Sequence, residues 1–315
     1  MHDLSPVSYE LMKRKPIDLS PFQHLYTFES HFMDMNGFQY HYVDEGSGSP
    51  VIMVHGNPTW SFYYRRLIQA LSPDFRAIAV DHIGCGLSDK PAVAQYDYTL
   101  DQRINDLDRF ISRLELKEKI TLVLHDWGGM IGIAFALRHL ARIDKLILLN
   151  TAAFFPPQNR PLPRRLKLIR HVKPFARVAV LGFNAFARSA LFMASAKGMS
   201  DDVKSGLLAP YDCWQNRIAT LRFVEDIPLK PGDPSFETVK TVQNDLHRLG
   251  DLPMPICWGM KDFVFTKAYL DEWRHRFPDA RVHTFENAGH YVLEDAAETV
   301  IDHVRKFMLE DGLSD

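Results

Sequence analysis

Short apolar runs alternate with longer amphipathic segments through the first half of the chain. Runs typical of strands that are covered on both faces occur at residues 51–54, 77–80, 121–124 and 146–149. Apolar side chains at helical spacing lie between them, most clearly over residues 99–116. Strands that alternate with helices imply right-handed crossovers, so the pattern predicts a mostly parallel sheet with helices on both faces.

The N-terminal part shows a different pattern, in which single apolar and polar positions alternate. Residues 25–33 and 38–43 alternate in this way, which predicts two strands. Asn36-Gly37 lies between them and is the strongest short signal for a hairpin. Residues 61–71 are expected to be helical, with Ser61 as a candidate cap.

The alternation of strands and helices stops after residue 150. Residues 154–230 contain helical patterns punctuated by prolines and no segment that fits the strand alternation, which indicates an inserted helical cap. The core pattern resumes at residues 253–259, and residues 281–285 supply a last strand. The predicted division is a core domain of residues 1–153 and 231–315 and a cap domain of residues 154–230.

Charge is distributed unevenly between these two parts. The 315-residue chain has a net charge of −2 and an ordinary globular composition, with 46% hydrophobic and 24% charged residues. Residues 154–230 contain 13 Lys/Arg and 5 Asp/Glu, a balance of +8, so the remainder carries −10. The overall balance gives no indication of nucleic acid as the main partner.

The cysteines and the apolar segments bear on the cellular compartment. Cys85, Cys213 and Cys257 are odd in number and widely spaced, which favours free thiols in a reducing compartment. Residues 1–22 lack the apolar centre of a secretory signal, and residues 178–196 are interrupted by polar side chains. We therefore expect a cytoplasmic protein.

One carboxylate stands at a tight turn between a buried strand and an apolar helix. The strand ends at Asp126, and residues 127–129 open the helix with two glycines, where two backbones must pass closely. This is the nucleophile-elbow arrangement, which holds a side chain at the top of a sheet beside backbone N–H groups. The alternative is an Asp that only caps the helix.

Four loops at the expected carboxyl ends of the strands carry reactive groups, and ligands of open α/β sheets bind at that edge. These loops are residues 55–58, 125–127, 261–262 and 288–290. Asp126, Asp262 and His290 follow one another in the nucleophile, acid and histidine order of α/β-hydrolases. Four matching loops in one order favour catalysis over a lone helix cap.

These residues divide the chemistry of a covalent mechanism among them. Asp126 is ionised at neutral pH and can attack without a base, unlike serine. His290 can accept or shuttle a proton, and Asp262 would hold the imidazole in one tautomer. Donors for a developing anion are the backbone N–H groups of Asn57 and Trp127, together with the Asn57 amide and the Trp127 indole N–H.

The elbow, residues 55–60 and residues 84–90 resemble the haloalkane dehalogenase branch of the α/β-hydrolases. Epoxide hydrolases are similar at the elbow, but they usually have an aromatic residue at the position of Asn57 and two cap tyrosines. Tyr211 is the only tyrosine in residues 154–230, which weakens the interpretation as an epoxide hydrolase.

Three further stretches, at residues 81–91, 149–154 and 209–212, resemble the β-lactone decarboxylases of long-chain olefin biosynthesis. The last stretch makes Tyr211 a further candidate for contact with the substrate or a developing anion. The resemblance implies an α/β-hydrolase fold, with a mostly parallel eight-stranded sheet, helices on both faces and an inserted helical cap. No cofactor or metal is expected, because the chain has no nucleotide-binding glycine loop and no metal-ligand cluster.

The resemblance implies that Asp126, Asp262 and His290 form the triad and that Asn57 and Trp127 stabilise the anion. The implied reaction converts a cis-3-alkyl-4-alkyl-β-lactone to a cis-alkene and carbon dioxide. Asp126 would displace the ring oxygen at the alkoxy carbon and then be expelled by anti elimination; attack at the lactone carbonyl is the rival path. In a haloalkane dehalogenase, water activated by His290 would instead hydrolyse the ester. A module that only binds a lipid-like ligand would not need Asp126.

The cap contains apolar side chains that either line a tunnel for two alkyl chains or form the core of the cap. They are Leu166, Leu168, Ile169, Val172, Phe175, Val178, Val180, Leu181, Phe183, Phe186, Leu191, Phe192 and Met193. A basic stretch in the same region consists of Arg160, Arg164, Arg165, Lys167, Arg170, Lys173 and Arg177. It is a solvated face, a contact for an anionic membrane surface or a docking site for an acidic partner. The resemblance favours partners, namely a β-lactone synthetase and a thiolase-like condensing enzyme in a multi-enzyme assembly.

Overall fold

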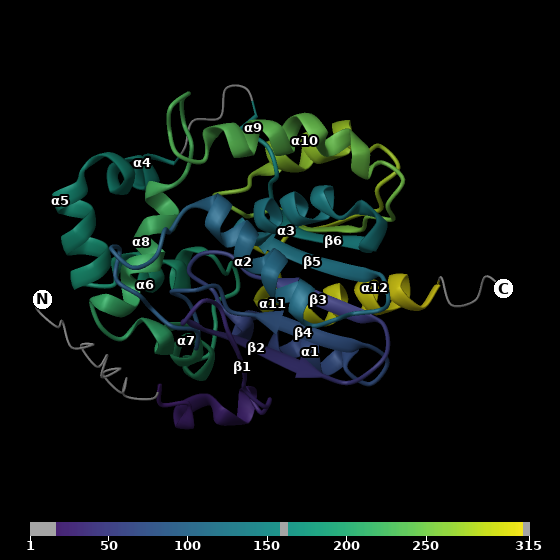
Figure 1. The fold of residues 1–315 in the computed structure, drawn as a ribbon, viewed down its shortest axis with the longest axis horizontal. Helices are drawn as coiled ribbons and strands as arrows, with labels where there is room; N and C mark the ends of the chain where they lie inside the picture. The colour runs from purple at the N-terminus through teal and green to yellow at the C-terminus, as the bar shows by residue number, and fades with distance from the viewer. Residues whose placement is uncertain (1–16, 158–162, 311–315) are drawn as a thin grey trace, which may run out of the picture.

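The computed structural model describes residues 17–157 and 163–310, and an eight-stranded sheet forms their centre (Figure 1). The strand order is β1-β2-β4-β3-β5-β6-β7-β8; β2 pairs antiparallel with β1 and β4, and all other pairs are parallel. The predicted mostly parallel sheet is therefore confirmed. The strands are β1 (His31–Asp34), β2 (Gln39–Glu45), β3 (Pro50–Val54), β4 (Arg76–Val80), β5 (Ile120–Asp126), β6 (Ile143–Thr151), β7 (Ile256–Gly259) and β8 (Val282–Phe285).

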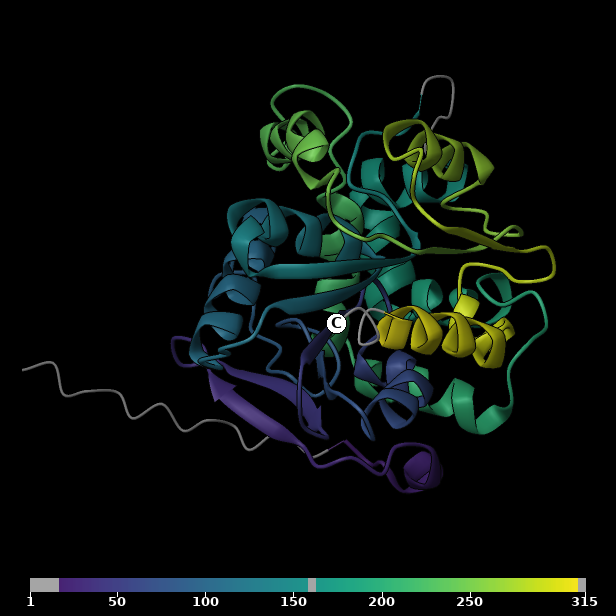
Figure 2. The same cartoon turned by 90° about the vertical axis from the view of Figure 1, so that its right-hand side faces the viewer.

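Helices cover both faces of this sheet, as Figure 2 shows. Alternate residues of a strand point to opposite faces, so Ile52 and Leu122 belong to one buried cluster and Met53 and Val123 to another. The first cluster includes side chains of α2, α3, α9 and α10, and the second includes side chains of α1, α11 and α12. The helices are α1 (Arg65–Leu71), α2 (Leu100–Arg113), α3 (Trp127–Arg138), α9 (Phe236–Asp245), α10 (Lys267–Arg276), α11 (Val292–Asp295) and α12 (Ala297–Glu310).

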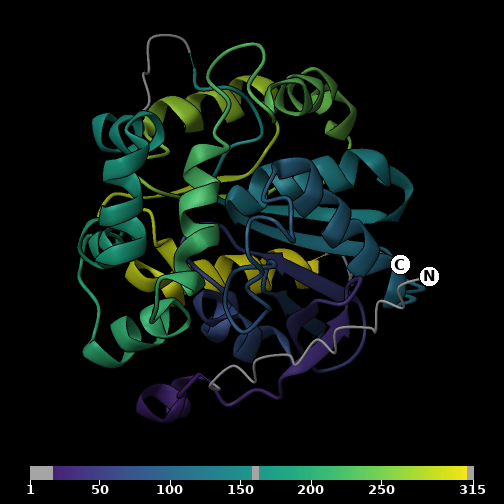
Figure 3. The same cartoon turned by 60° about the vertical axis from the view of Figure 1, so that its left-hand side comes forward.

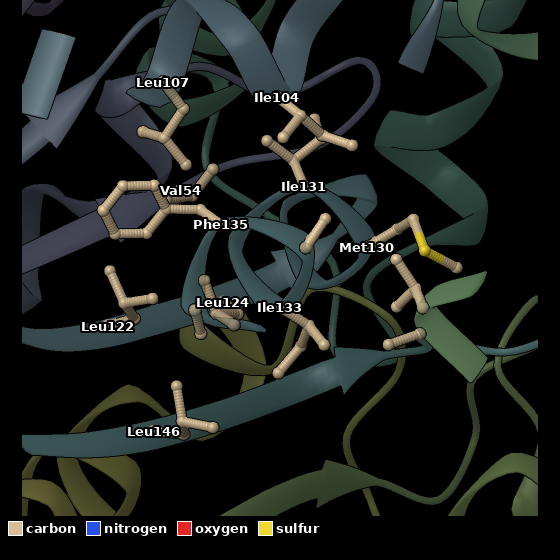
Figure 4. Packing of buried hydrophobic residues seen from close by; sticks show 14 of the residues in the cluster. Val54, Ile104, Leu107, Leu122, Leu124, Met130, Ile131, Ile133, Phe135 and Leu146 are labelled. Atoms are coloured by element: carbon tan, nitrogen blue, oxygen red, sulfur yellow. The ribbon is translucent and has the colours of Figure 1, made fainter. Parts of the chain in front are cut away.

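Helix α3 is apolar on nearly all sides because it is packed between the sheet and other helices. Ile131, Ile133 and Phe135 project from it among the side chains of Leu122 and Leu124 on β5 (Figure 4). All five side chains are fully buried, which stabilises the strand and the helix together by removing apolar surface from water. The turn between β5 and α3 is thereby held between two rigid elements.

The N-terminal hairpin is confirmed, but its first strand is shorter than predicted. Asn36 and Gly37 have φ values of 59° and 88°, the signature of a type I′ turn. The turn is closed by the Met35 N–H, which donates to the Phe38 carbonyl at 2.7 Å. The two strands pair on either side of it, with His31 opposite Tyr42.

Residues 25–30 are not part of the strand predicted for residues 25–33. Ser20–Leu25 forms a short 3₁₀ helix (η1), and the Tyr26 ring then packs 5.0 Å from the ring of Trp60. Apolar positions in this stretch therefore serve an aromatic cluster instead of a strand. The expected cap at Ser61 is also wrong, because its hydroxyl bonds to the Tyr26 hydroxyl at 2.6 Å and the helix has no side-chain cap there.

The described part of residues 154–230 contains helices and no strand, as predicted. These helices gather at one end of the molecule, on the left of Figure 1, and Figure 3 turns them toward the viewer. They are α4 (Arg164–His171), α5 (Lys173–Ala176), the π-helical turn η4 (Arg177–Gly182), α6 (Ala185–Met193), α7 (Asp201–Leu208), the short 3₁₀ turns η5 (Ala209–Tyr211) and η6 (Gln215–Arg217), and α8 (Ile218–Glu225).

Across the described ranges, no single helix combines the length and the apolar character needed to cross a membrane. One bent pair, Lys173–Gly182 with Ala185–Met193, meets both criteria when its halves are taken together, with a bend of 72° between them.

Candidate active site

Asp126 lies at the tight turn between β5 and α3, with φ 52° and ψ −126°, a conformation that few residues other than glycine adopt. Two glycines permit the close approach of the chains at this turn. A Cβ atom at Gly128 would lie 1.9 Å from the Val54 carbonyl oxygen, and one at Gly129 would lie 1.7 Å from the Thr151 hydroxyl oxygen. The Asp126 side chain accepts no hydrogen bond from the second or third N–H of α3, as a helix cap would, so the capping alternative is wrong.

Two backbone donors hold the Asp126 carboxylate. The Asn57 N–H donates to Oδ1 at 2.6 Å, and the Trp127 N–H also donates to this carboxylate. Burial raises the pKa of Asp126, and the charge of His290 and the two hydrogen bonds oppose this shift without cancelling it. The backbone N–H groups that we expected to bind an external anion are therefore directed at the carboxylate itself.

The His290 imidazole lies between two carboxylates. Its Nδ1 is 2.8 Å from Asp262 Oδ2, and its Nε2 is 3.6 Å from Asp126 Oδ2. The Nδ1–H donates a hydrogen bond to Asp262, so Nε2 is the nitrogen that faces Asp126. Burial lowers the pKa of His290, but the charge of Asp262, the hydrogen bond to it and the charge of Asp126 outweigh burial and raise the pKa.

Asp262, which follows β7, is fixed by three donors besides His290. The N–H groups of Val264 and Phe265 donate to Oδ1 at 2.7 and 3.0 Å, and the Asn150 amide donates to Oδ2 at 3.0 Å. Asn150 also accepts a backbone N–H of β7 at 2.8 Å, so it ties the ends of β6 and β7 together. Sequence reasoning missed Asn150, although its place directly after a predicted strand is the signal that singled out the other loops.

A second buried carboxylate, Asp295, joins the His290 loop to the helical segment. It accepts the Gly289 N–H at 2.7 Å, the Ser195 hydroxyl at 2.6 Å and the two N–H groups of residues 196–197 at 2.8 and 3.0 Å. One side chain of α11 therefore sets the distance between the histidine loop and the end of α6. Nothing in the sequence pattern singled out Asp295, because its partners are far apart along the chain.

A cavity of about 540 Å³ opens above these residues. We call Asn57, Asp126, Trp127 and His290 its floor, since they supply the polar groups at one end. The other lining side chains are mostly apolar, and most come from residues 152–156, the helical segment, α9, the loop after β7 and α10. They include Phe154, Phe155, Leu166, Ile169, Phe186, Met193, Val224, Ile227, Val239, Phe265 and Tyr269. A polar floor under apolar side chains suits a substrate with a small polar group and a large apolar part.

The thirteen cap residues proposed as tunnel lining fall into three sets. Those that line the cavity, called the roof below, are Leu166, Ile169, Phe186 and Met193. Those that are 43–75% exposed are Leu168, Val172, Phe175, Val178, Phe183 and Phe192. Those buried elsewhere are Val180, Leu181 and Leu191. Periodicity marked all of them as apolar, but it gave no indication of which helix face turns toward the cavity.

Asn57 and Trp127 line the cavity, whereas Tyr211 does not. The Asn57 amide donates to the Thr220 carbonyl at 3.0 Å, and its Oδ1 has no partner among the described residues. Tyr211 is fully buried in η5, and its hydroxyl donates to the Thr59 carbonyl at 3.2 Å. The expectation that Tyr211 contacts the substrate is therefore corrected, because its hydroxyl holds the backbone of the neighbouring loop.

The basic stretch divides according to what its side chains contact. Arg170 pairs with Asp233 at 2.7 Å, and Arg164 and Arg165 line the cavity. Lys167, Lys173 and Arg177 are exposed. Arg160 lies outside the described residues.

The residues that the structure describes include no group of three or more His, Cys, Asp or Glu side chains that could hold a metal ion. Two buried histidines near the floor are joined by a hydrogen bond, in which the backbone N–H of His82 donates to His55 Nε2 at 3.1 Å. Burial lowers the pKa of both. This pair supports the backbone of the Asn57 loop as an uncharged hydrogen-bonded unit.

Known proteins resemble this chain over nearly its whole length. A family profile described as alpha/beta hydrolase fold matches residues 49–297. A protein of Shewanella oneidensis named cis-3-alkyl-4-alkyloxetan-2-one decarboxylase is 50% identical over 287 residues, 91% of this chain and 90% of that protein. A protein of the same name from Xanthomonas campestris pv. campestris is 41% identical over 296 residues, 91% of this chain and 98% of that protein.

Among solved structures, a haloalkane dehalogenase of Agrobacterium tumefaciens matches with a TM-score of 0.79 and 25% identity. The match covers 89% of this chain and 96% of that one. The predicted resemblance to both groups is confirmed.

Proposed function

This chain belongs to the α/β-hydrolase fold family, and from that premise we propose that it decarboxylates cis-3-alkyl-4-alkyl-β-lactones (oxetan-2-ones) to cis-alkenes and carbon dioxide. The observation that carries the proposal is the buried Asp126 carboxylate beneath about 540 Å³ of mostly apolar space. A β-lactone with two alkyl groups has one small polar ring for the floor and two apolar chains for the space above it.

The proposed reaction has two bond-exchange steps at Asp126. First, its carboxylate oxygen attacks the alkoxy carbon of the ring with inversion, and the ring C–O bond breaks to leave a free carboxylate. Next, the C–C bond to that carboxylate breaks, carbon dioxide leaves, and the electron pair forms the alkene while it expels Asp126. Anti elimination keeps the two alkyl groups cis, and no water is consumed.

The other floor residues support the negative charge that develops in the first step. The Trp127 indole N–H and the Asn57 amide line the cavity and are the donors for the freed carboxylate. His290 has a raised pKa, so its cationic form is favoured and balances the charge as it forms. Asp262 keeps the imidazole oriented through the 2.8 Å contact with Nδ1.

A haloalkane dehalogenase is the alternative function, and the solved dehalogenase of similar fold favours it. The same floor would serve, with the Trp127 and Asn57 donors binding the departing halide. The difference lies in the fate of the ester, because in a dehalogenase water activated by His290 attacks the Asp126 carboxyl carbon.

Incubation with a synthetic cis-β-lactone, followed by gas chromatography, tests the proposal. We expect a cis-alkene from the wild-type chain and none from Asp126→Ala, with His290→Ala strongly impaired. A single turnover in heavy-oxygen water then separates the two functions. Label entering the Asp126 carboxylate would contradict direct elimination, and halide release from a short haloalkane at comparable rates would favour the alternative.

Residues 154–230 are proposed to act as a cap domain on a core of residues 1–153 and 231–315. The roof residues support this division, since they come from the helical segment and face the floor across the cavity. We assign the protein to the cytoplasm, in keeping with its three free cysteines.

A β-lactone synthetase and a thiolase-like condensing enzyme are proposed as partners in one assembly. The apolar cavity supports this arrangement, because a dialkyl lactone is poorly soluble and direct transfer keeps it out of water. Gel filtration with and without the synthetase, at two salt concentrations, tests it. Co-elution is expected, and separate elution at both concentrations would contradict it.

A further inference from the structure

The helices at the left edge of Figure 1, away from the sheet, carry a group of exposed apolar side chains. We call it the outer face; its large apolar side chains are Leu168, Val172, Phe175, Val178, Phe183 and Phe192. Phe183 and Phe192 are 71% and 75% exposed, and exposed apolar side chains that gather on neighbouring helices mark interaction sites. These side chains do not line the cavity, so substrate binding does not account for them.

The apolar side chains of the outer face come from neighbouring helical elements. Phe175 and Val178 lie three residues apart on the continuous segment of α5 and η4, whereas Leu168 lies on α4 and Val172 at the break between α4 and α5. Phe183 follows directly on the turn η4, whose end is fixed because Arg217 donates to two of its carbonyls, at 2.7 and 2.9 Å. The outer face is therefore built on several short helices, one end of which is fixed by hydrogen bonds to its backbone.

The helices of the outer face also carry positive charge. Exposed basic side chains on the same helices are Arg164, Lys167, Lys173, Arg177 and Arg188. The sequence contains no Asp or Glu from residue 145 to residue 200, which concentrates the positive charge of the cap domain here. Aromatic and aliphatic side chains with interspersed Lys and Arg are the composition of segments that lie in the headgroup region of anionic bilayers.

The outer face adjoins the cavity. Helix α4 carries Arg164 and Leu166 on the lining of the cavity and Leu168 on the outer face, within five residues. The cavity lining and the outer face therefore share one short helix.

We propose that the outer face docks on an anionic lipid bilayer and that the lactone and the alkene move between the bilayer and the cavity beside α4. The bent helix pair of α5, η4 and α6 has the apolar character needed to reach below the headgroups. The role in substrate transfer rests on the proposed function, since a molecule with two alkyl chains partitions into lipid. The docking itself does not depend on that function.

Vesicle flotation with the full chain tests the docking. The probes are phosphatidylcholine vesicles with and without about one-third phosphatidylglycerol. We expect binding to the anionic vesicles that weakens about fivefold for each outer-face Lys or Arg replaced by Gln. The double substitution Phe183→Ser with Phe192→Ser should weaken binding at least about tenfold, because two phenyl rings are no longer transferred from water into the bilayer.

Matched controls lie on other surfaces. Phe32→Ser removes an exposed phenyl group on β1, and Arg274→Gln removes an exposed charge on α10. Both should bind vesicles as the wild type does. Thermal melting and turnover of a short-chain soluble lactone check that the double Phe variant is folded and has an intact site.

Three results would overturn the proposal: no binding to anionic vesicles, equal binding by the double Phe variant, or loss of synthetase association by that variant without any vesicle binding. The last result would make the outer face a protein interface. Vesicle binding without lactone turnover would count against the proposed function alone.

Discussion

The floor and the roof of the cavity obey different physical requirements. The carboxylates of the floor and of its histidine are fixed by several short bonds: Asp126 accepts two backbone N–H groups, and Asp262, which orients His290, accepts three donors besides His290. The roof consists of apolar side chains that fill space and make no directional bonds to one another. A buried polar group without partners costs free energy, so the floor tolerates few arrangements, whereas many combinations of apolar residues fill one volume.

The largest effect expected from this contrast comes from Asp126→Asn. An amide of the same shape cannot attack carbon, so olefin formation should fall by at least about 10⁴-fold. Because the folded state raises the pKa of Asp126, the ionised group opposes folding at neutral pH, and its removal should leave the melting temperature unchanged or higher. Gas chromatography and calorimetry measure the two quantities. A loss of less than about tenfold would mean that another group is the nucleophile.

The contrast between floor and roof also explains how much of this site could be predicted from the sequence. Asp126 ends a strand, and Asp262 and His290 lie in loops that follow strands; the parallel sheet brings those ends together, so motif order was enough to group the three residues. The carboxyl-end position of Asn150 was equally visible but was not used. Asp295 was out of reach, because its donors at Ser195 and in the two following residues meet it only through the tertiary fold.

The errors at the fold level have the same origin. Residues 25–30 alternate like a strand, yet their apolar members fill an aromatic cluster that includes Trp60. Tyr211 was singled out by its sequence neighbours, and its hydroxyl holds a loop carbonyl instead of facing the cavity. In both places the local pattern reported that a side chain is buried and not which surface buries it.

The pH profile sharpens the account of the floor. Direct elimination needs ionised Asp126, so on the acid side its rate should not fall until the pH drops through the raised pKa of this carboxyl, and then about tenfold per unit. Ester hydrolysis needs neutral His290, whose pKa is raised, so that rate would already fall as the pH drops through a value above 6.5. We expect the first profile for lactone turnover. Stopped-flow assays in matched buffers measure it.

Asp262→Asn is the control for this profile. It removes the charge that contributes most to raising the pKa of His290. If the acid side of the pH–rate profile reports the titration of His290, it should therefore move to lower pH. If it reports the titration of Asp126, the pH at which the rate falls should change little. If the lactone profile moves with Asp262→Asn, His290 acts as a base and the elimination scheme is wrong.

Asp295→Asn tests whether the floor depends on its tie to the helical segment. The amide keeps the shape but loses acceptor capacity for its buried donors, which should cost about 1–3 kcal/mol of stability. The Gly289 N–H is one of these donors, so His290 should be misplaced and kcat should fall about tenfold while KM changes little. Asp44→Asn, which breaks a partly buried pair with Arg76, is the matched control and should lower stability alone. A proportional rise in KM would show that the tie shapes the cavity instead.

The smallest effect is expected at the roof and tests the other half of the contrast. Phe186→Leu and Met193→Leu exchange one apolar side chain for another, so kcat/KM for the lactone should change by no more than about threefold. Phe186→Leu alters volume alone, and Met193→Leu also removes the sulfur that accepts from Arg165 at 2.8 Å. For Phe186→Leu, any change should depend on alkyl chain length and be seen in KM. Assays with a short-chain and a long-chain lactone measure this dependence. A loss of about a hundredfold that is equal for both lactones would mean that the roof also positions the reacting ring, and the division between a directional floor and a space-filling roof would no longer hold.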